Sequence, residues 1–325
     1  MKAVLLAGGL GTRLRPLTYT RPKHLLPIAN KLHIDHVLEH LASHGIDDIV
    51  LTTSHLARAF EDVVGRARSR GLQMSLTHEA EPLGTAGGLK HAESVLEGGT
   101  FLVFNADVLT TADLGDLLTF HEDNSAEATI LLTPVDDPSR YGVVPTHDDG
   151  RVRGFIEKPP SGEAPTNYIN AGVYAMEPSI LKRIPGGRVA SIERELFPGM
   201  VQAEARLYAR PTDAYWIDIG TPESYLRANL DALDRSTGGA PALGEGTNVA
   251  ADARVSSSSI GAFSQIEAAA VVDRSVLLPG VVVGERAVVR GSILGEGVRV
   301  GPASTVIGST VADGEQRGVE DKGAG

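Results

Sequence analysis

Short apolar runs alternate with stretches of helical periodicity as far as residue 233. Four runs rich in β-branched or large apolar residues predict strands at residues 3–6, 48–53, 72–77 and 100–105. Apolar residues three or four apart predict two helices, carried by Ile34, Val37, Leu38, Leu41, Leu114, Leu117 and Leu118. This alternation is typical of βαβ units, so we predict an α/β domain with a Rossmann-like, mixed or largely parallel sheet.

A second periodicity follows the segment STGGAPALGEGT at residues 236–247. Apolar residues recur every 17 residues in three registers: Val249, Ile266, Val283 and Val300; Val255, Val272, Val289 and Val306; Ile260, Leu277, Leu294 and Val311. Serines keep the same period at Ser258, Ser275, Ser292 and Ser309. Such a segment buries its apolar positions only by stacking one coil on the next. The pattern resembles a short left-handed parallel β-helix built from hexapeptide-type repeats.

These patterns divide the chain into four parts. We predict an α/β domain over residues 1–234, a linker over 235–247, the β-helix over 248–312, and a polar, glycine-rich tail over 313–325 that we expect to be disordered. A chain of 325 residues with 42% hydrophobic residues is long enough to bury a core in each of two domains.

Cysteine is absent, which excludes disulfides, thiolate metal ligands and a cysteine nucleophile. This composition fits a reducing compartment, and we expect a cytoplasmic protein. The start MKAVLLAGG has no apolar run of signal-peptide length, and no later stretch approaches roughly 18 apolar residues. No membrane segment is therefore expected.

The formal net charge of -11 argues against nonspecific binding of nucleic acid, because the phosphate backbone would be repelled. The beginning of the chain differs from the rest. Six basic residues precede the first acid, Asp35, and they are Lys2, Arg13, Arg15, Arg21, Lys23 and Lys31. This segment predicts contact with an anion, and the alternative is chance clustering on a solvated face.

Glycines directly follow the first predicted strand, at Gly8, Gly9 and Gly11, and Thr12 and Arg13 come next. Glycines at this place let backbone amides approach a phosphate closely, and the basic side chain adds charge. The spacing fits neither a dinucleotide-binding loop nor a Walker loop. A tight turn without a ligand is the alternative.

The pattern GGxGTRLxP at residues 8–16, with Lys23 after it, resembles the signature of sugar-nucleotide pyrophosphorylases. Further segments follow in the order seen in that family: EPLGTAGG at 81–88, FNADV at 104–108, YGVV at 141–144, EKP at 157–159, INAG at 169–172, SIERELFP at 191–198 and WIDIGTPESY at 216–225. Together they resemble the sugar-1-phosphate nucleotidylyltransferases, and most closely the mannose-1-phosphate guanylyltransferases.

This resemblance implies a reaction in which the phosphate of a sugar 1-phosphate attacks the α-phosphorus of a nucleoside triphosphate and pyrophosphate leaves. GTP and mannose 1-phosphate are the expected substrates. Alternatives are thymidylyl or other nucleotidylyl transfer to glucose 1-phosphate, another hexose phosphate or a sugar-like cyclitol phosphate. A noncatalytic sugar-nucleotide sensor is an alternative of another class, although intact Arg13, Lys23, Asp107, Lys158 and Asp218 argue against it.

By the same resemblance, Arg13 would hold the departing pyrophosphate, Lys23 the α-phosphate and Lys158 the sugar phosphate. The residues expected to bind the nucleotide are Leu6, Ala7, Gly8, Gly9, Gly11, Thr12, Arg13, Lys23, Glu79, Pro82, Gly84, Thr85, Asn105 and Asp107. Those expected at the sugar phosphate are Tyr141, Gly142, Glu157, Lys158, Asn170, Gly172, Glu193 and Asp218. Guanine presents N1 and N2 donors that a carboxylate can accept, and either Glu79 or Glu81 could supply it.

The resemblance also implies that Asp107 and Asp218 bind Mg²⁺. Taken alone, each aspartate fits a turn or a helix cap better than a metal site, because aspartate favours such positions. Magnesium prefers oxygen ligands and keeps several waters, which suits two carboxylates together with phosphate oxygens. Arg13, Lys23, Asp107 and Asp218 are therefore the predicted catalytic residues.

Two other features of the sequence could indicate a second function, namely a metal site or an acyltransferase. His33, His36, His40 and His44 lie near one face of a predicted helix, and we interpret them as a solvated flank rather than a metal site. The β-helix contains no histidine that could act as the base of an acyltransferase, since the last histidine is His147. We therefore expect this domain to be structural, either forming a homo-oligomer or modulating the first domain.

Overall fold

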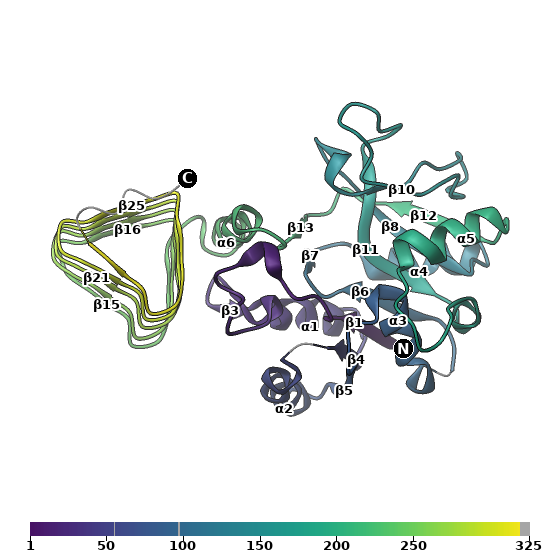
Figure 1. The fold of residues 1–325 in the computed structure, drawn as a ribbon, viewed down its shortest axis with the longest axis horizontal. Coiled ribbons are helices and arrows are strands. Elements are labelled where there is room, and N and C mark those ends of the chain that lie inside the picture. The colour runs from purple at the N-terminus through teal and green to yellow at the C-terminus, as the bar shows by residue number, and fades with distance from the viewer. Residues whose placement is uncertain (55, 97, 319–325) are drawn as a thin grey trace. The chain divides into compact units, whose positions relative to one another are not determined.

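The computed structural model describes residues 1–54, 56–96 and 98–318 (Figure 1). The chain forms two compact units that are interleaved in sequence. One consists of Met1–Leu10 and Asp35–Trp216, and the other of Gly11–Ile34 and Ile217–Gly325. Residues 11–34 thus group with the carboxyl-terminal part of the chain, whereas the sequence pattern had assigned all of 1–234 to one domain. Among the described residues, no helix has the length and hydropathy needed to cross a membrane.

The first unit contains a nine-stranded mixed sheet in which β10, β9, β11, β6, β1, β4 and β5 are neighbours in that order. Its parallel part consists of β5 (Gln73–His78), β4 (Asp48–Thr53), β1 (Lys2–Leu6) and β6 (Phe101–Asn105). These are the four strands predicted from the apolar runs, so that prediction is confirmed. In the register of this sheet, Leu6 lies opposite Thr52 on one side and Asn105 on the other.

The other strands make the sheet mixed. β11 (Tyr168–Met176) runs antiparallel to β6 and to β8 (Ala128–Pro134), and β12 (Leu207–Pro211) runs parallel to β8. The short strands β9 (Gly142–Val143) and β10 (Ile156–Glu157) pair with each other, and β9 also pairs with β11. The register between β11 and β8 shifts between Asn170 and Tyr174, as at a β-bulge.

The helices begin and end close to the predicted apolar stripes, as α1 and α4 show. Their bounds are α1 His33–Ser43, α2 Glu61–Ser69, α3 Gly84–His91, α4 Leu114–Asp123, α5 Phe197–Gln202 and α6 Pro222–Thr237. Short helical turns lie at Thr12–Leu14, Lys23–Leu25, Ala57–Phe60, Glu93–Val95, Pro138–Arg140, Pro178–Arg183 and Ile192–Leu196. The remaining short strands outside the β-helix are β2 Pro27–Ile28, β3 Lys31–Leu32, β7 Val108–Thr110 and β13 Trp216–Asp218.

One apolar core of the first unit joins its sheet to α3 and α5. Val4, Val103, Leu132 and Phe197 belong to the same buried cluster, and each is at most 1% exposed. Tyr174 of β11 is also completely buried in this cluster, although it carries a hydroxyl group. Such a group needs a hydrogen-bond partner, and the partners of Tyr174 belong to the candidate site.

The second unit contains the predicted left-handed β-helix, and Figure 1 draws its coils as a stack of triangles. Equivalent strands of successive coils pair in parallel, with Val249 opposite Ile266 and Val289 opposite Val306. The observed pairing thus confirms the registers read from the sequence. The strands are β14 Ala242–Leu243, β15 Asn248–Val249, β16 Arg254–Ser256, β17 Ser259–Ile260, β18 Gln265–Ile266, β19 Val271–Asp273, β20 Val276–Leu277, β21 Val282–Val283, β22 Val288–Arg290, β23 Ile293–Leu294, β24 Arg299–Val300, β25 Thr305–Ile307, β26 Thr310–Val311 and β27 Gln316–Arg317.

Pairing extends beyond the predicted ends of the β-helix. β14 lies inside the segment predicted as a linker, and β27 lies inside the segment predicted as a disordered tail. The pattern missed β27 because Gln316 and Arg317 are polar and continue no apolar register. Residues 319–325 of the predicted tail lie outside the described residues.

The periodic serines form a ladder through the β-helix. The Oγ of Ser258, Ser275 and Ser292 each donates to a carbonyl two residues earlier, at 2.7 to 2.8 Å. Each Oγ also accepts from the amide of the next serine in the ladder, at 3.0 to 3.2 Å. The ladder satisfies polar groups that stacking would otherwise bury without partners.

Candidate active site

The glycine-rich loop begins where β1 leaves the sheet. The Ala7 amide donates to the Thr52 carbonyl at 2.9 Å, and the Ser54 hydroxyl donates to the Gly8 carbonyl at 2.9 Å. After these bonds the chain becomes exposed, at Gly9 and at Leu10. The predicted nucleotide-binding residues Leu6, Ala7, Gly8 and Gly9 therefore lie at the carboxyl edge of the parallel strands, where ligands of such sheets bind.

Glu79 lies against this loop with a buried carboxylate. The residue is 3% exposed, and its Oε2 accepts a hydrogen bond from the Leu83 amide at 2.9 Å. A Cβ added to Gly8 would lie 3.7 Å from both carboxylate oxygens, and one added to Gly88 would lie 2.6 Å from Oε1. Glu81, the other candidate for reading the base, is exposed. Glu79 is thus the carboxylate that borders the glycine loop.

The start of α3 is fastened to the segment before α5. The Thr85 hydroxyl donates to Glu193 Oε2 at 2.8 Å and accepts from the Ile192 amide at 2.9 Å. Gly84 has a φ of +74°, and a Cβ there would lie 2.5 Å from the Ala190 carbonyl oxygen. Thr85 and Glu193, predicted for the nucleotide and for the sugar, are therefore bonded to each other. Pro82 precedes this junction and is exposed.

Four predicted sugar-phosphate residues meet across β9 and β10. Gly142 pairs with Glu157, and the Lys158 amide donates to the Tyr141 carbonyl at 2.9 Å. Lys158 has a φ of +53°, its side chain is 57% exposed, and its Nζ lies 3.8 Å from Glu157 Oε1. A Cβ on Gly142 would lie 2.6 Å from the Phe155 ring. The strand pair therefore presents an exposed cation beside a carboxylate.

A hydrogen-bonded chain runs through Tyr174, which sequence reasoning missed. Asn170 Nδ2 donates to the Tyr174 hydroxyl at 2.8 Å, and this hydroxyl donates to Glu193 Oε1 at 3.4 Å. Burial, reinforced by the charge of Glu193, raises the pKa of Tyr174 well above its usual value, so the phenol stays protonated and can donate. The available signal was a tyrosine two residues after Gly172, within an apolar run that follows Asn170.

Gly172 of β11 packs against Asn105 at the end of β6. It has a φ of +73°, and a Cβ there would lie 2.9 Å from Asn105 Nδ2. Asn105 Oδ1 is buried and has no hydrogen-bond partner among the described residues. The predicted nucleotide residue Asn105 thus lies directly against the predicted sugar residue Gly172. Asp107 is two residues further along, half-buried in the turn before β7.

Trp216 reaches the same strands. Its Nε1 donates to the Ala171 carbonyl at 2.8 Å, and its ring lies edge-on to Tyr141 with the centroids 5.6 Å apart. The tryptophan therefore ties β11 to the segment that leads to Lys158.

The second unit brings Arg13 and Asp218 together around Gly220. A Cβ on Gly220 would lie 2.7 Å from Arg13 Nη2 and 2.6 Å from Asp218 Oδ1, and this oxygen also accepts from the Gly220 amide. Only glycine leaves room for both side chains at this place. Gly11 has a φ of +62°, and its carbonyl accepts from the Thr18 hydroxyl at 2.8 Å. Thr12 and Arg13 follow as exposed residues.

Asp107 and Asp218 are the carboxylates predicted to bind Mg²⁺. Within residues 1–54, 56–96 and 98–318, no group of three or more histidine, aspartate or glutamate side chains is arranged to hold a metal. Magnesium needs few protein ligands, since substrate phosphates and water complete its shell. The carboxylates of Asp107 and Asp218 suit that type of binding, and their sharing of one metal stays a prediction.

At least two of the six early basic residues, Lys2 and Arg21, are paired with acids. Lys2 Nζ lies 2.6 Å from Asp48 Oδ2, and Arg21 Nη2 lies 2.8 Å from Glu296 Oε2. The anion predicted for the whole segment therefore cannot engage all six cations. Arg13 and Lys23 remain the predicted phosphate contacts, with Lys23 half-buried at the start of a short helical turn.

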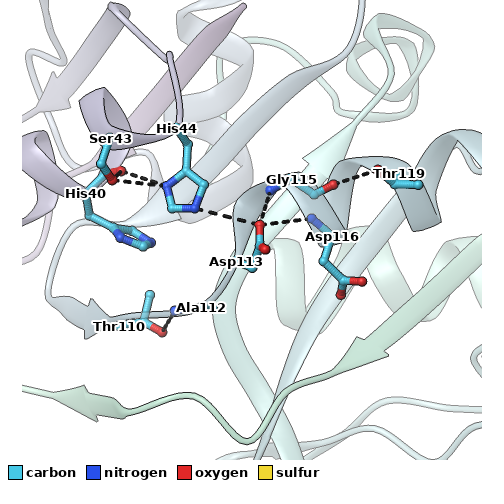
Figure 2. A network of polar contacts seen from close by, with 9 residues as sticks. All are labelled: His40, Ser43, His44, Thr110, Ala112, Asp113, Gly115, Asp116 and Thr119. Atoms are coloured by element: carbon cyan, nitrogen blue, oxygen red, sulfur yellow. Dashed lines mark hydrogen bonds and ion pairs between the residues drawn. The ribbon is translucent and has the colours of Figure 1, made fainter.

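The four histidines at and after α1 fit the predicted solvated flank only in part, since His44 is exposed. His33 is completely buried, and His44 bonds to the end of its own helix through a 2.9 Å contact between Nδ1 and the His40 carbonyl. Figure 2 shows how His44 also faces Asp113, which caps α4, with Nε2 3.8 Å from Oδ1. Burial, and then the neighbouring His44, lower the pKa of His40. The cluster joins two helices, and its side chains make no metal site within the described part of the chain.

Comparison with known proteins defines the class. Residues 2–235 match the family described as nucleotidyl transferase, and residues 239–324 match the family described as the GlmU-like C-terminal hexapeptide. The chain belongs to the nucleotidyl transferase family and is a nucleotidyltransferase.

Its curated relatives include mannose-1-phosphate guanylyltransferases. The chain is 43% identical over 242 residues to Mannose-1-phosphate guanylyltransferase of Mycobacterium tuberculosis (strain ATCC 25618 / H37Rv), covering 74% of this chain and 67% of the relative. It is 43% identical over 230 residues to Mannose-1-phosphate guanylyltransferase catalytic subunit beta of Danio rerio, covering 70% of this chain and 63% of the relative. For the catalytic subunit beta of Drosophila pseudoobscura pseudoobscura, the matched part is 60% of the relative's length.

Solved structures agree with the fold. HddC from Yersinia pseudotuberculosis in complex with GMP-PN is 32% identical, with a TM-score of 0.62 over 71% of this chain and 99% of that chain. A putative glucose-1-phosphate thymidylyltransferase from Bacillus anthracis, in complex with a sucrose, is 26% identical, with a TM-score of 0.63 over 73% of this chain and 96% of that chain.

Proposed function

We propose that this nucleotidyltransferase transfers a guanylyl group from GTP to mannose 1-phosphate and releases pyrophosphate. The names of the curated relatives support this choice of substrates, and so does the HddC complex with a guanine nucleotide analogue. The activity of the whole protein is part of the proposal, because the matched part spans 60 to 67% of the lengths of those relatives.

The buried carboxylate of Glu79 carries the assignment of guanine. It borders Gly8, and one of its oxygens is fixed by the Leu83 amide. Guanine offers adjacent N1 and N2 donors, whereas thymine offers a single N3 donor. A fixed acceptor beside the nucleotide loop therefore favours guanine, and charge strengthens such a hydrogen bond.

The chemistry requires positioning more than a protein nucleophile. An oxygen of the sugar phosphate forms a bond to the α-phosphorus of the triphosphate while the bond from this phosphorus to the bridging oxygen breaks, and pyrophosphate leaves with the electron pair. The nucleophile is already an anion, so catalysis reduces to in-line alignment and neutralisation of charge. We assign Arg13 to the leaving pyrophosphate, Lys23 to the α-phosphate and Lys158 to the sugar phosphate.

Mg²⁺ is the proposed cofactor, and when bound it would neutralise charge on the phosphate oxygens. We assign Asp107 and Asp218 as its protein ligands. Asp218 Oδ1 accepts a hydrogen bond from the Gly220 amide, and this bond orients the carboxylate even without the metal.

Sugar contacts are assigned to Glu157, Asn170 and the backbone at Gly142 and Gly172. Glu193 accepts hydrogen bonds from Thr85, Ser191 and Tyr174. We therefore give Glu193 a bracing role beside the sugar, in addition to any contact with a hydroxyl group.

A matrix of substrates tests the proposal. GTP, dTTP, UTP, CTP and ATP are each paired with mannose 1-phosphate and glucose 1-phosphate, and pyrophosphate release is measured. We expect the GTP and mannose 1-phosphate pair to have the highest kcat/KM. Preference for dTTP and glucose 1-phosphate would instead establish the thymidylyl alternative, and absence of release from every pair would refute the assignment of these substrates. Glu79→Gln should narrow the preference for GTP over dTTP about tenfold, the loss expected of one charged hydrogen bond.

We further propose a cytoplasmic homo-oligomer that associates through the β-helix. Phe263, Ile307 and Leu243 of this domain are 64%, 62% and 51% exposed, and such apolar surface favours association. Light scattering of the purified chain measures its mass in solution, and cell fractionation tests its location.

A further inference from the structure

The β-helix contacts the loop that carries Lys23 on both sides of this lysine. Thr20 and Arg21 bind the β-helix before Lys23, and Asn30 binds it afterwards. All these residues belong to the second compact unit, Gly11–Ile34 with Ile217–Gly325. The contacts are therefore internal to one body of the structure.

Arg21 makes the strongest of these contacts. Its Nη2 lies 2.8 Å from Glu296 Oε2 and 2.7 Å from Asp313 Oδ2, and the Thr20 hydroxyl donates to the same Asp313 oxygen at 2.8 Å. The side chains of Arg21 and Asp313 are only 20% and 23% exposed, while that of Glu296 is 54% exposed. A guanidinium between two carboxylates, largely shielded from water, holds its geometry better than a single exposed ion pair.

The period of the β-helix brings the two acids together. Glu296 and Asp313 are 17 residues apart, and the Glu296 amide donates to Asp313 Oδ1 at 2.8 Å. The equivalent positions in the two preceding coils hold Pro279 and Ala262. Like charges stacked in this way repel each other, and a cation between them removes the repulsion. Arg21 therefore meets an acidic pair that only the last coils possess.

The second anchor, after Lys23, uses two carbonyls and a serine hydroxyl of the first coils. Asn30 Nδ2 donates to the carbonyls of Ala242 and Ile260 at 3.1 and 2.9 Å, and its Oδ1 accepts from the Ser259 hydroxyl at 3.2 Å. Asn30 has a φ of +64°, a left-handed conformation that asparagine tolerates better than most residues. This turn is thus fixed by three hydrogen bonds to the β-helix.

Helix α6 supports the stretch between the anchors. The buried Tyr225 hydroxyl donates to the Pro27 carbonyl at 2.6 Å, and Asn229 Oδ1 accepts from the Ala29 amide at 2.9 Å. Between Arg21 and Lys23 stands only Pro22, whose φ of -60° is set by its ring. Because Pro22 is rigid, a displacement of Arg21 therefore also displaces the backbone of Lys23.

We propose that the β-helix positions Lys23 for the transfer reaction, and that Arg21, Glu296 and Asp313 are positioning residues acting through this loop. The role of Lys23 itself rests on the proposed function. The assignment gives the β-helix a part in catalysis that does not depend on a catalytic group of its own. It also predicts that a substitution in the last coils, at Glu296 or Asp313, alters how Lys23 binds the α-phosphate.

Full-length Arg21→Gln, Glu296→Gln and Asp313→Asn are compared with the wild type for pyrophosphate release. We expect kcat to fall about tenfold in Arg21→Gln, because small displacements of a catalytic group cost one to two orders of magnitude. The double variant Arg21→Gln with Asp313→Asn should be only slightly slower than Arg21→Gln alone, since both changes remove the same ion pair and Asp313→Asn in addition weakens only the neutral hydrogen bonds of Asp313. Arg21→Lys should recover part of the rate, because lysine keeps the positive charge but lacks the planar guanidinium that can bind two carboxylates in a fixed geometry.

Glu285→Gln is the matched control. Glu285 is a half-exposed acid of the same domain, 3.1 Å from Arg286, and its neutralisation should leave kcat unchanged. Hydrogen exchange of residues 20–32 and trypsin cleavage after Lys23 are measured in parallel, because both report the loop without requiring activity. We expect faster exchange and cleavage in Arg21→Gln and wild-type behaviour in Glu285→Gln.

The result that overturns the proposal is wild-type kcat in Arg21→Gln, or unchanged exchange of residues 20–32 in that variant. An equal loss of kcat in Glu285→Gln also overturns it, because the effect would then be one of general charge. If the wild type released no pyrophosphate from any substrate pair, the proposed reaction would fail instead, and exchange and cleavage would still decide whether the β-helix holds the loop.

Discussion

Removal of the Tyr174 hydroxyl should loosen the sugar side of the site while leaving the fold in place. In Tyr174→Phe the ring still fills its position in the core, but Asn170 Nδ2 loses its acceptor at 2.8 Å and Glu193 Oε1 loses its donor at 3.4 Å. The tyrosine is completely buried, so water cannot replace these bonds without rearrangement. One net hydrogen bond and one poorly satisfied partner together cost about 1 to 3 kcal/mol of unfolding free energy.

The effect on catalysis should be selective. Asn170 lies in the candidate sugar site, and Glu193 also holds Thr85, so Glu193 retains part of its anchoring through Oε2. We expect the KM for the sugar 1-phosphate to rise about tenfold, which corresponds to roughly 1.4 kcal/mol, and the KM for the nucleotide to change much less. Steady-state kinetics with each substrate varied in turn, together with urea unfolding, separates binding from stability.

Tyr208→Phe is the matched control, because Tyr208 packs its ring against Phe120 at a centroid distance of 6.3 Å in the same unit. This variant should keep both KM values. Equal KM values for the sugar phosphate in Tyr174→Phe and wild type would refute the reasoning, as would a parallel rise for both substrates.

Two further predictions concern space and protonation. Gly220→Ala should lower kcat about a hundredfold, because the added Cβ would lie within 2.7 Å of both Arg13 and Asp218 and displace them. A kcat near that of the wild type, in a variant with a normal melting curve, would contradict this prediction. The pKa values of His40 and His121 are lowered from 6.5, in both cases mainly by burial. As the pH falls, these histidines therefore become protonated in the unfolded chain at a higher pH than in the folded chain. Their contribution to the free energy of unfolding is fully present above pH 6.5 and is lost as the pH falls below that value. Melting curves between about pH 5.5 and 8 should show a lower Tm on the acid side, and a smaller fall in the variant with His40→Gln and His121→Gln; an identical slope in that variant would count against these histidines.

Much of the fold followed from local patterns. Apolar runs predicted β1, β4 and β6, because a strand buried on both faces needs consecutive apolar residues. The edge strand β5 was predicted from apolar residues that alternate with polar ones. The 17-residue period gave the β-helix registers, since stacked coils place equivalent residues opposite each other, as Val249 and Ile266 do. The polar end strand β27 carried no such pattern and was found only in the structure.

The grouping of site residues was predicted by resemblance, but their mutual contacts were not. Thr85 and Glu193 were expected to meet different substrates, and they are bonded to each other. Tyr174 was absent from the predicted site, because an aromatic residue in a buried strand is usually only part of the core. Periodicity reports which face of an element is buried and contains no information about which distant polar group will satisfy a buried hydroxyl.

The sequence by itself determined the four parallel strands of the sheet, the repeat of the β-helix and the family to which the chain belongs, because each of these follows from local spacing or from the order of motifs. The tertiary structure alone decided that residues 11–34 belong with the carboxyl-terminal unit, and that Arg21 binds Glu296 and Asp313. Such pairs join segments nearly 300 residues apart. Their partners are fixed by the three-dimensional course of the chain, which no local pattern specifies.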